Sequence, residues 1–473
     1  MPVSARKINN ARGTKKQKQP QQSARPEDAN IYANIRYLIG LQIASRLVSF
    51  LINNWILRSL AKDSATRTQF ALLNAKYDLL AGILVSLARE PIRNVVLQVK
   101  EEDQFCSLAW IIPPASAGIC LVYWIVNPSM ASMSIAALIL ESLTEPTSMC
   151  YAMIWNQPRK KALIEMTGLL VKSSVLLAYA KFPDLPAAVR SAHLAHSLCL
   201  LFLYTGIFKW PSFAVPKRSV AHQLVRNMIY ALLRFALCPS EAVLAAAFCS
   251  SSEQATFSLV SNYGSMILRL LAQPINDASL QYFSQTNSHH YFGRTMKLLL
   301  YLSAALISFG AFFTDPLVHV LLGRHWAQEG VVAGALAWYC VHVAVQIIAG
   351  FGDSYIQATF SSELQKKLHY WSLVRSALQA SLGFAGHRLF GLDGFIAANA
   401  LCTSCHVMLC FSMLKFPKIP RPVFCSILVA FLVNFYIHLS YRNEWLMRIA
   451  SGSALGLFIL YTIYRWDRHS LHL

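Results

Sequence analysis

The chain has 473 residues, of which 55% are hydrophobic and only 14% are charged. In soluble domains about a quarter of the residues are charged, so this composition excludes a soluble globular protein. The formal net charge is +20, but most lysines and arginines stand between apolar runs, where the positive-inside rule accounts for them without nucleic acid. The sequence therefore predicts an all-α membrane protein.

Residues 1–30 are rich in Lys, Arg, Gln and Pro and hold almost no large apolar side chain, which predicts a disordered basic tail. Beyond this tail, apolar runs alternate with polar, Pro or Gly breaks and predict about fourteen membrane-spanning helices. The expected spans are 34–57, 69–97, 105–126, 130–155, 162–181, 187–208, 220–248, 254–284, 295–322, 330–358, 368–386, 390–414, 422–441 and 445–465.

An even number of spans places both termini on one side of the membrane. If that side is the cytosol, it receives the basic tail and most basic loops, among them Arg159-Lys160-Lys161 and Lys366-Lys367. Cytosolic loops carry the excess of Lys and Arg, so we expect both termini in the cytosol.

The stretch 87–94 places three charges and a proline inside a predicted span. A charge at bilayer depth costs about 2.5–3.5 kcal/mol on insertion scales, so these side chains are expected to face a protein interior or a water-filled cavity. Residues 270–281 repeat the pattern of 87–98, because both carry Leu, Pro-Ile and Leu-Gln at matching positions. The six-span offset between the copies indicates parallel repeats with a substrate cavity between two lobes.

Several polar side chains occur at helical spacing within the spans. Residues four apart share a helical face, which pairs Arg89 with Arg93 and Glu141 with Glu145. The candidate cavity residues are Arg46, Asn53, Arg89, Glu90, Arg93, Glu141, Glu145, Lys161, Arg269, Gln273 and Asp277. One interpretation is a cationic cavity for a phosphorylated, hydroxyl-rich headgroup, with its anion-binding wall in the first lobe, because the planar fork of Arg suits phosphate. The other is that the arginines pair with the glutamates and hold the helices together.

Signatures of catalysis and cofactor binding are scarce. The sequence has no G-x-x-x-x-G-K-[ST] loop and no His/Cys/Asp cluster with metal-site spacing, so we expect a transporter without a cofactor and not an enzyme. The segment from Cys402 to His406 matches the C-x-x-C-H haem pattern, but it lies inside an apolar run without a second such motif. Cys238 and Cys249 lie near a predicted lumenal loop, where a disulfide can form.

Four segments resemble motifs of the eukaryotic Rft oligosaccharide-translocation proteins of the endoplasmic reticulum, part of the superfamily of multidrug, oligosaccharidyl-lipid and polysaccharide exporters. They are residues 42–54 with Ser45-Arg46 and Asn53, residues 87–93 with Arg89-Glu90, residues 141–146 with Glu145-Pro146, and residues 262–275 with Gln273-Pro274-Ile275. The chain departs from the family at Pro91 and at Asn276-Asp277, which indicates a divergent member.

This resemblance implies four parts: the tail 1–30, a six-helix lobe over 31–210, a second six-helix lobe over 211–415, and two extra helices over 416–473. It implies translocation of a dolichol-diphosphate oligosaccharide, with two N-acetylglucosamines and five mannoses, across the endoplasmic reticulum membrane for N-glycosylation. Two alternatives remain: a non-transporting accessory protein of this pathway, and an ion-coupled exporter of small amphipathic molecules. The expected partners are the dolichol-linked oligosaccharide, membrane lipids and other N-glycosylation proteins, with no nucleic acid.

Overall fold

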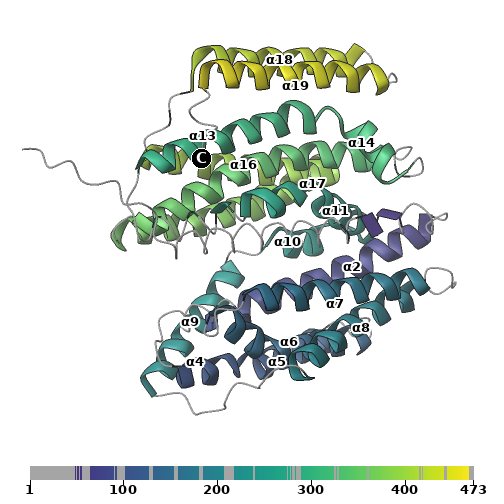
Figure 1. Cartoon of the computed structure of the whole chain (residues 1–473), viewed down its shortest axis with the longest axis vertical. Coiled ribbons are helices and arrows are strands. Elements are labelled where there is room, and N and C mark those ends of the chain that lie inside the picture. The colour runs from purple at the N-terminus through teal and green to yellow at the C-terminus, as the bar shows by residue number, and fades with distance from the viewer. Residues whose placement is uncertain are drawn as a thin grey trace, which may run out of the picture.

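A computed structural model of the chain shows a bundle of helices (Figure 1). The residues it describes are 48, 51–52, 54–55, 64–89, 91–92, 102–126, 132–153, 158–179, 185–206, 218–237, 240–273, 275–276, 279, 283, 289–323, 326, 330–359, 362–414, 417, 419–440 and 445–467. Among them, 9 helices are long and apolar enough to cross a membrane. This confirms the predicted class of multi-pass helical membrane protein, while the count of about fourteen spans stays a prediction.

The helices of the N-terminal half form the lower part of Figure 1. They are α2 (Ser64–Leu84), the π-helical turn η1 (Val85–Arg89), α4 (Glu102–Ala109), α5 (Ile112–Val126), α6 (Ser132–Met153), α7 (Pro158–Tyr179) and α8 (Leu185–Gly206). Helix α8 packs against α2, α6 and α7. Buried apolar side chains such as Leu80, Leu84 and Leu138 fill the space between α2 and α6.

Most helices of the C-terminal half form the middle part of Figure 1 around a central helix, α16, whereas the first of them, α9, lies in the lower part. They are α9 (Arg218–Leu237), α10 (Glu241–Phe248), α11 (Ser251–Gly264), η2 (Leu268–Ala272), α13 (His289–Ala305), η3 (Leu306–Gly310), α14 (Thr314–Leu321), α16 (Val331–Thr359) and α17 (Ser362–Met413). The largest buried cluster lies here and includes Val343, Phe351 and Phe395. Helix α11 also packs against α2, and α9 against η1, so these contacts join the two halves.

The predicted span 220–248 is divided into two helices, α9 and α10, in the structure. The sequence has Pro239 between them. Because proline lacks a backbone donor and its ring clashes with the preceding turn, it interrupts a helix that the apolar run alone would continue.

Both copies of the repeated motif contain a π-helical turn at the same position. η1 ends at Arg89 and η2 at Ala272, in each case two residues before the proline of the motif, Pro91 or Pro274. A proline cannot donate to the carbonyl four residues earlier, which lies inside the π turn. Single-turn π bulges within helices are frequent at functional sites. The two copies of the motif thus share a local backbone feature as well as identical residues.

Helix α17 is two helices joined at Gly391, where φ is 62° and ψ is −144°. Its two parts match the predicted spans 368–386 and 390–414. The backbones of Gly386 and Gly394 touch across the break, since a methyl group on either would overlap the carbonyl oxygen of the other. These glycines therefore allow the chain to fold back tightly.

Gly394→Ala is expected to lower stability by about 1–2 kcal/mol. Overpacking typically costs about 1–3 kcal/mol, and the better helix propensity of alanine recovers up to about 1 kcal/mol. Thermal unfolding of the protein in detergent measures the change. Gly82→Ala in α2 is the control, because no described atom lies within 4 Å of its new methyl group. Equal melting temperatures for the two variants would contradict the close approach.

The last two helices, α18 (Arg421–Ser440) and α19 (Trp445–Asp467), pair with each other at the top of Figure 1. Polar contacts fix α19 to the preceding helices near both of its ends. Near its start, Arg448 Nη1 lies 3.4 Å from Asp315 Oδ2, and Nη2 lies 2.9 Å from His438 Nδ1. At its end, Asp467 accepts from Lys297 Nζ at 3.3 Å and from the Tyr301 hydroxyl.

Arg448→Met is expected to destabilise the docking of α19 by about 1.5 kcal/mol. Arg448 is 1% exposed, and its hydrogen bonds to charged groups are worth about 1.5–3 kcal/mol. We use the lower end of this energy range because Asp315 is 44% exposed, so water can hydrate its carboxylate when the arginine is removed. Thermal unfolding in detergent provides the measurement, with the exposed Arg465→Met on the same helix as control. The same melting temperature for both variants would contradict an anchoring role for Arg448.

Candidate functional site

A buried cluster of opposite charges joins α2 to α6. Arg89 Nη2, in the π turn η1, lies 3.2 Å from Glu141 Oε1 and 3.1 Å from Glu145 Oε1. The two glutamates are four residues apart on one face of α6, as their spacing predicted. Their side chains are only 24% and 17% exposed. One guanidinium therefore compensates two carboxylates within the helices of the first half.

Aromatic and basic side chains extend this cluster toward α7 and α8. The Tyr77 hydroxyl donates to Glu141 Oε2 at 3.4 Å, and the Tyr77 ring stacks on that of His193 with centroids 3.6 Å apart. Lys172 Nζ lies 5.8 Å from the centre of the same ring. Four helices thus contribute to one polar network, which we call the Arg89 network.

A polar cavity of about 510 Å³ lies where α2 meets the helices of the second half. Its described lining residues are Asp78, Ser240, Glu241, Ala242, Phe257, Ser258, Ser261, Asn262, Ser265, Arg269, Tyr339, Gln346, Ser372, Arg375, Ser376 and Gln379. Only the first of these comes from the N-terminal half; the others lie on α10, α11, η2, α16, α17 and the segments next to them. A position between the halves is where two parallel repeats are expected to enclose a substrate.

The charges of this cavity are balanced among the lining residues that the structure describes. Asp78 and Glu241 are acidic, whereas Arg269 and Arg375 are basic. Glu241 Oε1 lies 2.6 Å from His342 Nε2, which is almost fully buried on α16. Glu241 thus has a cationic or hydrogen-bonding neighbour in His342 as well as in the cavity arginine Arg375.

The two arginines are held differently. Arg269 Nη2 donates to the backbone oxygen of Asn262 at 2.6 Å and to its Oδ1 at 2.7 Å, so this guanidinium is positioned by the end of α11. Arg375 has a buried Nε that finds no acceptor among the described residues. A buried donor without a partner costs about 1–3 kcal/mol, and an anionic ligand in the cavity would supply the acceptor.

The structure brings together only some of the candidate residues from the sequence. The Arg89 network contains Arg89, Glu141 and Glu145. Here the arginine pairs with the glutamates, as in the second interpretation of the sequence, in which these charges hold the helices together. Lys161 pairs with Glu165 at 3.6 Å. Of the rest, Arg269 lines the cavity and Gln273 is exposed next to η2, whereas Arg46, Asn53, Glu90, Arg93 and Asp277 lie outside the described residues.

Sequence reasoning missed three charged residues of the cavity. Asp78, Glu241 and Arg375 each stand alone within or at the edge of an apolar run, without a charged residue four positions away that shares their face. The available signal was the charge itself, since an ionisable residue inside a span marks a functional site by default.

The cysteine expectations are resolved in two places. Cys249 carries a free thiol, and Cys238, the partner that the sequence allowed for a disulfide, lies outside the described residues. In the C-x-x-C-H segment Cys402 is buried and Cys405 is exposed. His406 of the segment instead contacts Asp353, with Nε2 2.9 Å from Oδ1.

Comparisons with known proteins agree with this fold. The proteins named Man(5)GlcNAc(2)-PP-dolichol translocation protein RFT1 from Dictyostelium discoideum and Drosophila melanogaster are each 22% identical to this chain. The first alignment covers 90% of this chain and 90% of the relative. The second covers 77% and 81%, respectively.

Two solved structures share the fold at low identity. The lipid II flippase MurJ, in an inward closed conformation, has a TM-score of 0.65 and 11% identity over 91% of this chain and 99% of its own. A transporter of the MOP superfamily from Pyrococcus furiosus has a TM-score of 0.51 and 12% identity, over 89% and 97%. A family model described as Rft protein matches residues 30–473. The chain thus belongs to the Rft protein family.

Proposed function

We propose that this chain translocates a dolichol-diphosphate-linked oligosaccharide, with two N-acetylglucosamines and five mannoses, across the endoplasmic reticulum membrane for N-glycosylation. The relatives are named as translocation proteins for Man(5)GlcNAc(2)-PP-dolichol, which favours transport over catalysis. The cavity between the two halves is the observation in this molecule that supports the proposal.

The cavity has the chemistry that such a substrate requires. Arg269 and Arg375 are suited to the diphosphate, because a guanidinium donates two parallel hydrogen bonds to phosphate oxygens. The amide and hydroxyl groups of residues such as Gln346 and Gln379 suit sugar hydroxyls, which both donate and accept. Sites of about 300–1,000 Å³ hold ligands of drug size, so a cavity of about 510 Å³ is suited to the diphosphate and the nearest sugar. The remaining sugars and the polyprenyl chain would extend beyond it.

The proposed architecture follows the repeat. Residues 31–210 and 211–415 would form two six-helix lobes on either side of the cavity, followed by two further helices over 416–473. Basic loops on one side of the predicted spans favour cytosolic termini, including the basic tail 1–30. With alternating access, the lobes would open the cavity first to the cytosolic and then to the lumenal leaflet.

A reconstituted translocation assay tests the proposal. Purified protein in liposomes is given the lipid-linked oligosaccharide on one leaflet, and its appearance on the other leaflet is followed by accessibility to a lectin. Transfer that depends on the protein supports translocation. Binding without transfer would favour an accessory role in N-glycosylation, and proton-coupled efflux of small amphipathic molecules without any response to the lipid would favour an exporter that uses Asp78 or Glu241.

A further inference from the structure

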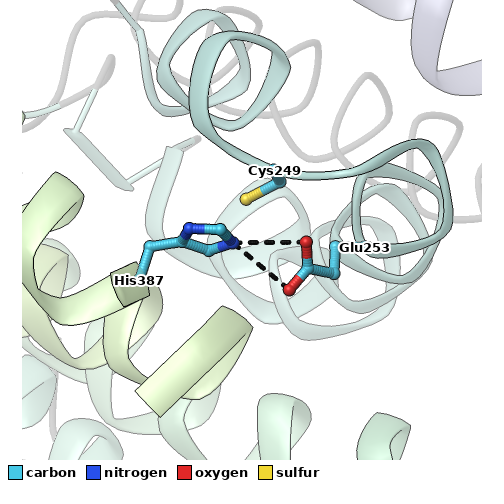
Figure 2. A group of neighbouring side chains, drawn as sticks. All are labelled: Cys249, Glu253 and His387. Atoms are coloured by element: carbon cyan, nitrogen blue, oxygen red, sulfur yellow. Dashed lines mark hydrogen bonds and ion pairs between the residues drawn. The ribbon is translucent and has the colours of Figure 1, made fainter. Parts of the chain in front are cut away.

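Three potential metal ligands meet where the turn between α10 and α11 approaches α17, and none of them lines the cavity. They are Cys249 and Glu253, on either side of the start of α11, and His387, just before the break in α17. Figure 2 shows the Cys249 thiol pointing toward the imidazole of His387, which faces the Glu253 carboxylate. One ligand atom from each side chain lies within 4.8 Å of the other two. We call this group the turn cluster.

Local structure fixes each member of the turn cluster. Ser250 caps α11, and its backbone N–H and hydroxyl both donate to Glu253 Oε2 at 2.8 Å. This capping box holds the carboxylate in place while Oε1 still faces His387. The break in α17 at Gly391 lies next to the Glu253 carboxylate, because a Cβ on this glycine would lie 3.8 Å from Glu253 Oε1.

The distance between His387 and Glu253 suits ligands of one metal ion. His387 Nε2 lies 3.2 Å from both carboxylate oxygens, longer than the about 2.7–2.9 Å of a charge-assisted hydrogen bond. In a tetrahedral zinc site with bonds of about 2.0–2.1 Å, nitrogen and oxygen ligands are about 3.3 Å apart. A shift of at most about 1.2 Å brings the Cys249 sulfur to the about 3.6 Å that a zinc–sulfur bond of about 2.3 Å requires.

We propose that Cys249, Glu253 and His387 bind a Zn²⁺ ion that fixes the α10–α11 turn to the break in α17. Thiolate, imidazole and carboxylate are the three ligand types that zinc takes in proteins. The side chains of His387 and Glu253 are 18% and 30% exposed, which leaves room for water as the fourth ligand. This zinc site is independent of the proposed transport function, because none of its three ligands lines the cavity.

The assignment rests on the geometry, and the protonation states of the free ligands set what zinc has to displace. Burial, together with the charge of Glu253, raises the pKa of the Cys249 thiol to about 12. Burial also acts to raise the pKa of Glu253, but hydrogen bonds from Ser250 and His387 outweigh it and leave this pKa below its usual value. The carboxylate is therefore ionised at neutral pH, and zinc would displace the proton of the thiol.

A second group of similar composition differs in two respects. Asp353, His406 and Cys410 lie within α16 and α17, not at a turn. Their His–Asp distance is 2.9 Å, the length of an ordinary charge-assisted hydrogen bond. Cys410 Sγ lies 3.5 Å from Asp353 Oδ1 and 3.6 Å from His406 Nε2, so this thiol takes part in the same hydrogen-bonded group. Hydrogen bonds among the three side chains account for their positions without a metal ion, and the group provides the matched control for the turn cluster.

The test uses the full chain in detergent, without a histidine tag and freed of metal by a chelator. Zn²⁺ is titrated and the bound metal counted, and Co²⁺ is used as a spectroscopic substitute that gives a thiolate-to-cobalt band. The expected result is one Zn²⁺ per chain and a cobalt–thiolate band, both lost in Cys249→Ser and His387→Gln and both kept in Cys410→Ser. Unchanged metal content in Cys249→Ser, or its loss only in Cys410→Ser, would overturn the assignment.

A measurement on the unmodified chain covers the case in which a variant does not fold. Alkylation of each cysteine is followed by mass spectrometry with and without Zn²⁺. At a free Zn²⁺ concentration ten times the Kd, Cys249 should react about tenfold more slowly, because only about a tenth of the sites stay open. The exposed Cys405 should be unaffected. An unchanged rate at Cys249 while metal binds would exclude the turn cluster as the site.

Discussion

Arg89→Gln is expected to destabilise the protein by about 3–5 kcal/mol, the cost of removing one partner from a buried ion pair. Without the guanidinium, Glu141 and Glu145 remain as two largely buried carboxylates on one face of α6. Both carboxylates are costly to bury without a cation, and they also repel each other. The folded yield in detergent, by size-exclusion chromatography, and the melting temperature measure the loss.

A neutral version of the same network is the control. The triple variant Arg89→Gln, Glu141→Gln, Glu145→Gln removes all three charges, and replacing a whole buried ion cluster is often neutral for stability. It should therefore recover most of the stability that Arg89→Gln loses. A triple variant as unstable as the single one would show that the charges of Glu141 and Glu145 are not the cause.

The triple variant also separates the two interpretations of Arg89. If this residue only holds the helices together, the stable triple variant supports N-glycosylation in cells at normal protein levels. If Arg89 binds the diphosphate, the triple variant folds but fails. Normal glycosylation with Arg89→Ala at normal protein level would likewise remove this residue from the substrate site.

The sequence could predict the pairing of Arg89 with Glu141 and Glu145 because the spacing of residues within single helices indicates it. Glu141 and Glu145 share a face by their spacing alone, and a charge within an apolar span requires a partner. Arg89 was one of the few basic residues within a neighbouring predicted span that could pair with these glutamates. The alternation of apolar runs likewise predicted the class of the protein, and the predicted break between the spans 368–386 and 390–414 lies just before the observed one at Gly391.

The cavity could not be predicted in the same way because its residues meet only through tertiary packing. Asp78 on α2 faces Arg269 and Arg375 only because α2 packs against α11, and no spacing within one helix encodes that contact. The π turns η1 and η2 also rotate the residues beyond them, which alters the faces that a regular helix would present. Candidate residues that were selected because they share a helical face therefore lay mostly in the N-terminal half. The arginines that line the described cavity, Arg269 and Arg375, lie in the C-terminal half.

Arg375→Gln is expected to weaken binding of the lipid-linked oligosaccharide by about ten- to a hundredfold. A hydrogen bond to a charged group is worth about 1.5–3 kcal/mol, and each 1.4 kcal/mol is a factor of ten. The fold should survive, because Glu241 keeps its contact with His342 at 2.6 Å. Binding is measured on purified protein in nanodiscs by competition with a fluorescent diphosphate lipid. Arg388→Gln, which changes an exposed arginine just before the break in α17, is the control and should bind like the unmodified chain.

The conservative variant Arg375→Lys distinguishes a diphosphate contact from a general effect of charge. Lysine keeps the positive charge but cannot donate the two parallel hydrogen bonds of a guanidinium, so it should recover binding only in part. Adding Arg269→Gln to Arg375→Gln should weaken binding further if both arginines hold the same diphosphate. If the double variant binds and translocates the lipid at the rate of the Arg388→Gln control, the diphosphate does not bind in this cavity, and the anion site must lie among residues such as Arg46 and Arg93.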